Sequence, residues 1–150
     1  VDEHKDASVF IAKNEAQTTT LTKRDLEMEL GIILGGMVAE DELCGEDSKT
    51  IATAHDVTEA TAKARRMVVE YGFGDIMNNT SLVELQDYAM MSGKEILDDI
   101  QKILSGATSE TEALLSKNKD ILAKLTEELA IKGTMNNDDL KAFFEANELA

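Results

Sequence analysis

Histidine and cysteine, the side chains best suited to metal binding and catalysis near neutral pH, are scarce in this chain. There are two histidines, His4 and His55, and a single cysteine, Cys44. His55 adjoins Asp56, but neighbours on a helix point about 100° apart, so we interpret His55 as an exposed residue near a helix N-terminus. We expect Cys44 to be a small buried hydrophobe rather than a reactive thiol. One cysteine cannot form an internal disulfide.

Near the start of the chain, His4 and Ser8 lie four residues apart, with Lys5 between them. On a helix this spacing places His4 and Ser8 on one face, one turn apart. Ser8 activated as a nucleophile by Lys5 is a chemistry that we consider but do not favour. A helix from about Asp2 to Asn14 is predicted to present these residues, since apolar side chains recur there at helical spacing, at Ala7, Phe10 and Ile11. Gln17 to Thr20 interrupts that helix.

The second predicted helix begins at Thr22. Asp25 follows Thr22 by three residues, and this spacing is typical of a capping box. The apolar stripe of this helix reaches Leu43 and consists of Leu26, Leu30, Ile33, Leu34, Met37 and Val38. Gly35 and Gly36 cost helix stability, so we expect them to let another helix backbone approach closely. The polar stretch from Gly45 to Thr50 is a predicted loop.

A third helix is predicted from about Thr53, and Gly72 and Gly74 end it. Its apolar positions are Val57, Ala60, Ala64, Met67 and Val68. Asn78-Asn79-Thr80 is a turn signal. The apolar residues that follow, Leu82, Val83, Leu85 and Tyr88, fit either a strand or a short helix.

The C-terminal third has the longest regular pattern. From Lys94 an apolar face runs through Ile96, Ile100, Ile103, Leu104, Leu114, Leu115, Ile121, Leu122, Leu125 and Leu129. Ser105-Gly106 is its one weak point and a predicted kink. Gly133 ends the pattern, and Asn136 or Asn137 is predicted to cap a last helix that contains Leu140, Phe143 and Phe144.

Composition agrees with a helical protein. The 150 residues include no proline, 43% are hydrophobic, and the net charge is -15. We expect a single all-α domain over residues 1–150, a bundle of about five to six helices with a long C-terminal helix or helical hairpin and little or no sheet. The negative charge repels phosphate backbones and anionic membranes, which argues against nucleic-acid binding. No segment has the length of a membrane span.

Three stretches resemble, in order, the peptidase domain of the FtsH-type ATP-dependent zinc metalloproteases. The first runs from Leu21-Thr22-Lys23 to Gly35-Gly36-Met37-Val38-Ala39-Glu40, and resembles the family's Leu-Thr-Lys helix that ends in Gly-Gly-Arg-Ala-Ala-Glu. The second and most specific runs from Asp56-Val57-Thr58-Glu59-Ala60-Thr61 to Ala64-Arg65-Arg66-Met67-Val68-Val69-Glu70-Tyr71-Gly72. The third is the C-terminal run from Glu95 to Leu140.

The resemblance implies a zinc site that this chain does not fully keep. In the family, two histidines at i and i+4 bind the metal, a glutamate after the first activates water, and a distant aspartate completes the ligands. Read without gaps, His4 matches the first histidine and Asp56 the aspartate, whereas Lys5 replaces the glutamate and Ser8 the second histidine. We therefore expect no catalytic residue and no bound metal, with His4, Ser8 and Asp56 as vestigial ligand positions.

The family also carries a longer insertion, which includes a sheet, where only Lys13 to Leu21 intervene here. We therefore expect binding of an extended peptide substrate to be lost as well.

The leading hypothesis is a degenerate peptidase domain that keeps an assembly role with itself or with related FtsH-type subunits, in a hexamer as in the family. One alternative is an active zinc metalloendopeptidase with ligands from outside the motif, such as His55 or Cys44. Another is an acidic helical protein-binding module. Family members are anchored on bacterial, mitochondrial or chloroplast membranes and carry an AAA ATPase upstream, and any membrane attachment here is expected to come from such an upstream segment.

Overall fold

The computed structural model describes residues 21–45, 50–85 and 93–150, and within these ranges it is helical. The elements are α1 (Lys23–Cys44), a short 3-10 helix η3 (Ile51–Thr53), α2 (Ala54–Val69), α4 (Gly93–Lys117), α5 (Lys119–Lys132) and α6 (Asn137–Ala146). The described residues contain no strand, only one isolated bridge between Phe73 and Asn78. The predicted all-α class with five to six helices is confirmed. The predicted helix over residues 2–14 and its interruption at 17–20 lie outside the described residues.

Helix α1 begins at the predicted cap. The Asp25 amide donates to Thr22 Oγ1 at 3.2 Å, and the Thr22 amide donates to Asp25 Oδ2 at 2.8 Å. This reciprocal pair satisfies amides that have no acceptor within the helix. The apolar stripe points inward as expected, and its buried members are Leu26, Leu30, Leu34 and Val38.

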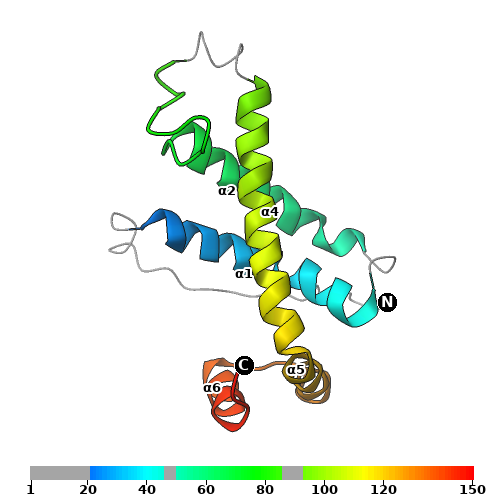
Figure 1. The fold of residues 1–150 in the computed structure, drawn as a ribbon. Coiled ribbons are helices and arrows are strands. Elements are labelled where there is room, and N and C mark those ends of the chain that lie inside the picture. Colours follow the sequence, from blue (N-terminus) through cyan, green and yellow to red (C-terminus); the bar gives the residue numbers. More distant parts are fainter. Residues whose placement is uncertain (1–20, 46–49, 86–92) are drawn as a thin grey trace.

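The core lies where α1, α2 and α4 pack against one another. Figure 1 shows α4 as a long helix that runs across both α1 and α2. Small residues of α2 allow this close packing, because Ala60 and Ala64 are fully buried against the leucines of α1. Met67 and Val68 fill the space beside them, and Ile100 and Ala107 of α4 close the cluster.

The chain leaves α2 through a tight turn. Gly72 has a φ of 65°, a backbone conformation that glycine adopts readily, and the Phe73 amide donates to the Met67 carbonyl at 2.8 Å. Asn79 also has a positive φ, in agreement with the predicted turn. Leu82 is buried and begins a hydrogen-bonded turn that ends at Leu85, so the described part of this apolar stretch is neither strand nor helix. Tyr88 lies outside the described residues.

Other sequence predictions are also wrong. α4 runs unbroken through Ser105-Gly106, and the long C-terminal pattern breaks instead at Asn118, between α4 and α5. Cys44, the last residue of α1, is exposed rather than buried. Among the described residues, nothing lies within 4 Å of a Cβ built on Gly35, so the expected close helix approach is not found there.

The last helices follow the predicted signals more closely. Gly133, with a φ of 76°, ends α5. Asn136, the first of the two candidates, caps α6 by accepting from the amides of Asp138 and Asp139. Phe143 is buried, whereas Phe144 is exposed. No helix in the described ranges is both long and apolar enough to span a membrane.

Candidate functional site

Of the predicted ligand positions, the structure describes Asp56. This aspartate lies in the first turn of α2 and is half-buried. Gly36 of α1 lies opposite, since a Cβ built there would be 3.7 Å from Asp56 Oδ2. His55 is exposed near the N-terminus of α2, as predicted. His4, Lys5 and Ser8 lie outside the described residues.

The predicted ligand positions include only two side chains of the types that a zinc peptidase centre uses. Such a centre needs three good protein ligands and an open position for water. Asp56 has a carboxylate, and the other two positions predicted from the resemblance carry one imidazole, His4, and one hydroxyl, Ser8. A neutral hydroxyl is a poor zinc ligand, and the Lys5 ammonium has no lone pair with which to accept a proton from water. Within residues 21–45, 50–85 and 93–150, no three His, Cys, Asp or Glu side chains are grouped so that they could hold a metal ion.

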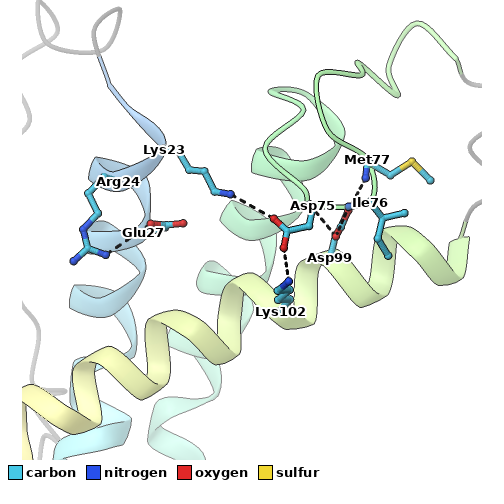
Figure 2. A network of polar contacts seen from close by, with 8 residues as sticks. All are labelled: Lys23, Arg24, Glu27, Asp75, Ile76, Met77, Asp99 and Lys102. Carbon is cyan, nitrogen blue, oxygen red and sulfur yellow. Dashed lines mark hydrogen bonds and ion pairs between the residues drawn. The ribbon is translucent and has the colours of Figure 1, made fainter.

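The most elaborate polar arrangement in the described structure surrounds Asp99 of α4. Asp99 is only 2% exposed. Figure 2 shows its carboxylate facing the loop after α2, where it accepts the amides of Asp75 at 3.0 Å, Ile76 at 3.1 Å and Met77 at 2.9 Å. Gly74 makes this approach feasible, because a Cβ there would lie 2.8 Å from Asp99 Cγ. A buried carboxylate satisfied in this way fixes the loop to α4.

Asp75, one of the loop residues whose amides Asp99 accepts, forms ion pairs of its own. The Asp75 carboxylate accepts a hydrogen bond from Lys102, and Lys23 Nζ lies 4.0 Å from it (Figure 2). The hydrogen bond from Lys102 holds the pKa of Asp75 below its ordinary value, and the same contact raises the pKa of Lys102. These residues line a groove of about 240 Å³ between α1 and α4, together with Glu27 and Glu110.

The pKa shifts resolved in this groove favour the charged forms of Asp75 and Lys102. A catalytic acid or base needs a pKa close to the working pH. Each pKa shift resolved among the described residues moves the group away from neutrality, lowered for aspartates such as Asp25 and raised for Lys102, Arg24 and similar cations. Because the buried Asp99 carboxylate accepts three amides of the loop after α2, we assign the Asp99 network a structural role.

Sequence reasoning did not find Asp99. Its signal is present, because Asp99 falls three residues after Ile96 and so lies on the apolar face that Ile100 and Ile103 also define. A charge at such a position must have strong partners in order to be buried. The partners themselves come from a loop 22 to 24 residues away, which no local pattern in the chain indicates.

Comparison with known proteins assigns the family. Residues 7–143 match the model of peptidase family M41. The chain is 30% identical over 130 residues to the ATP-dependent zinc metalloprotease FtsH 2 of Symbiobacterium thermophilum, a match that covers 83% of this chain and 22% of that protein. It is 26% identical over 136 residues to the mitochondrial inner membrane i-AAA protease supercomplex subunit YME1 of Saccharomyces cerevisiae, covering 90% of this chain and 18% of that protein. The chain thus spans about a fifth of the length of these relatives. On the strength of the family match over most of its length, the chain belongs to peptidase family M41.

Proposed function

We propose that this chain is a catalytically degenerate FtsH-type peptidase domain that keeps a helical assembly role in an ATP-dependent protease-like complex. The proposal rests on a contrast between the packed helical core and the residue types at the predicted metal and base positions. The helical core of α1, α2 and α4 is well packed around residues such as Leu30, Ala64 and Met67, all fully buried. In the same chain, reading the family motif onto the sequence without gaps puts Lys5 at the general base and Ser8 at the second histidine.

The chemistry of these two replacements supports loss of hydrolysis. A lysine ammonium cannot deprotonate water and repels a divalent cation beside it. His4 and Asp56 alone are too few ligands to hold zinc tightly. No bound metal is therefore part of the proposal, although zinc would be the expected metal if other ligands were recruited.

The proposed partners are other protein subunits, either copies of this chain or related FtsH-type subunits, and in the family such domains form hexamers. The relative from Saccharomyces cerevisiae is named as a supercomplex subunit of the mitochondrial inner membrane. By analogy, any membrane attachment and any ATPase would come from a segment upstream of this domain. A P-loop of the form G-x-x-x-x-G-K-[ST] in the upstream sequence of the parent gene would support this organisation.

The decisive experiment measures metal and cleavage together. We expect the purified chain to contain far less than one zinc per molecule by elemental analysis and to leave casein intact with or without chelator. A double variant, Lys5→Glu with Ser8→His, restores the family's residue types and should raise bound zinc towards one per chain, since Asp56 and the core are kept. Stoichiometric zinc and chelator-sensitive cleavage in the unaltered chain would overturn the proposal in favour of an active metalloendopeptidase.

Assembly needs a separate test. Light scattering at micromolar concentration, alone and after mixing with an active family subunit, should reveal a species larger than the 16.4 kDa chain. A strictly monomeric chain that also fails to join active subunits would contradict the assembly role. That outcome would favour a plain acidic helical binding module.

A further inference from the structure

The break between α4 and α5 is not caused by a proline or a glycine. Residues 116–119 are Ser-Lys-Asn-Lys, with neither proline nor glycine. The apolar positions continue across them at helical spacing, from Leu115 to Leu122 and Leu125. A continuous helix from Gly93 to Lys132 would therefore satisfy the local pattern, yet α4 ends at Lys117 and α5 begins at Lys119.

The contacts of one side chain, Asn118, account for the break. Asn118 is 5% exposed, and its φ of -112° and ψ of 25° depart from helical values. Its Nδ2 donates to the Leu114 carbonyl at 2.8 Å, and its Oδ1 accepts the Ala150 amide at 2.7 Å. Both ends of the side-chain amide are thus used, one on α4 and one on the segment that follows α6.

The segment after α6 is held by further contacts to the same region. Lys124 of α5 donates to Asn147 Oδ1 at 3.3 Å, and Asn147 Nδ2 donates to the Phe143 carbonyl at 2.9 Å. Residues 147–150 therefore connect α6, α5 and the break itself. In Figure 1, α5 is seen nearly end-on below the lower end of α4, beside α6.

The bent form lacks backbone hydrogen bonds that a continuous helix would have, and it gains contacts between α5 and α1. As the first residues of a new helix, Lys119, Asp120 and Ile121 have amides with no acceptor inside α5, whereas a continuous helix would pair them with carbonyls one turn earlier. In return, the bend places α5 against α1, where Lys119 Nζ lies 3.7 Å from Glu42. The bent form also has the two hydrogen bonds of the Asn118 side chain, to the Leu114 carbonyl and from the Ala150 amide.

We propose that Asn118 is a conformational hinge and that residues 147–150 are its latch. With the latch docked on Asn118, α4 and α5 stay bent and α5 contacts α1. Release of the latch allows the two helices to join into one continuous helix and takes α5 away from α1. This inference concerns the described fold and does not depend on whether the domain is catalytically degenerate.

The test measures the distance across the hinge in the full chain. Spin labels on Gln101→Cys and Glu127→Cys, in a Cys44→Ser background, place one probe on each exposed helix surface. A continuous helix would separate the two positions by about 39 Å along its axis, and any bend makes the distance shorter. Asn118→Leu removes both hydrogen bonds and should shift the measured distance towards that limit. Hydrogen exchange at the amides of residues 119–121 should slow at the same time.

Two matched controls isolate the hinge and the latch. Ser116→Leu adds the same side chain at an exposed position of α4 and should leave the distance unchanged. Ala150→Pro removes the amide hydrogen that Asn118 accepts and also fixes the φ of residue 150, and it should add a longer-distance population, whereas Ala150→Gly keeps the amide and should not.

Each outcome decides part of the proposal. If the distance between the two spin labels in both Asn118→Leu and Ala150→Pro equals that in the unaltered protein, the proposal is overturned. A longer distance in Asn118→Leu alone would support the hinge and refute the latch. If Asn118→Leu does not fold, the comparison of Ala150→Pro with Ala150→Gly decides the proposal, since both changes leave Asn118 intact.

Discussion

Substitution of Asp99 by asparagine tests whether one buried carboxylate fixes the loop after α2. The change keeps the shape of the side chain but removes its charge and converts one acceptor oxygen into a donor. Asp75 and Met77 donate to different oxygens, at 3.0 Å and 2.9 Å. Whichever way the new amide is oriented, one of these two backbone amides loses its acceptor.

The size of the effect follows from these bonds. A hydrogen bond to a charged group contributes about 1.5 to 3 kcal/mol, and the remaining bonds weaken when the acceptor becomes neutral. We therefore expect Asp99→Asn to lower the free energy of unfolding by about 3 kcal/mol. With an m-value of about 2 kcal/mol per molar urea, the midpoint of urea unfolding should fall by about 1.5 M.

Asp98→Asn is the matched control. Asp98 is the neighbouring residue, but its side chain is 44% exposed and pairs with Lys94 at 3.1 Å one turn away. Exposed pairs of this kind contribute about 0.5 kcal/mol or less. Urea titrations followed by circular dichroism at 222 nm should separate the two variants clearly. If the free energies of unfolding of Asp99→Asn and Asp98→Asn differ by less than about 0.5 kcal/mol, the difference is smaller than a single hydrogen bond to a charged group. In that case the Asp99 carboxylate does not hold the loop and our reasoning is refuted.

Two further changes follow from the same structure. Gly74→Ala should destabilise the fold by about 1 to 3 kcal/mol, because its Cβ would press on the buried Asp99 carboxylate. Gly106→Ala has nothing within 4 Å of its Cβ and should stabilise α4 by about 1 kcal/mol. Thermal unfolding that gives the two variants the same midpoint temperature would contradict this. Hydrogen bonds from the Thr22 hydroxyl and amide lower the pKa of Asp25 in the folded state, so the contribution of this cap is complete above the unfolded-state pKa of about 4 and is lost as the pH falls through the folded value. Urea titrations from pH 5 to pH 2 should therefore show a smaller loss of stability in Asp25→Asn than in the parent, and equal losses would argue against the cap.

The candidate site was only partly predictable. The pairing of His4, Ser8 and Asp56 followed from spacing and from resemblance to a family, and the family is confirmed by the match over residues 7–143. The structure adds that Asp56 faces Gly36 across the contact between α1 and α2. The proposed loss of hydrolysis stays a prediction that zinc analysis must test.

Local patterns in the chain were enough to predict the helical class, the caps at Thr22 and Asn136, the end of α5 at Gly133 and the buried stripe of α1. These features depend on residues within one or two turns of each other, so a local pattern contains all the information they need. The burial of Asp99, the exposure of Cys44 and the bend at Asn118 became visible in the packed helices alone. Asp99 depends on amides up to 24 residues away and Asn118 on an amide 32 residues away, and such partners meet only after the helices have packed.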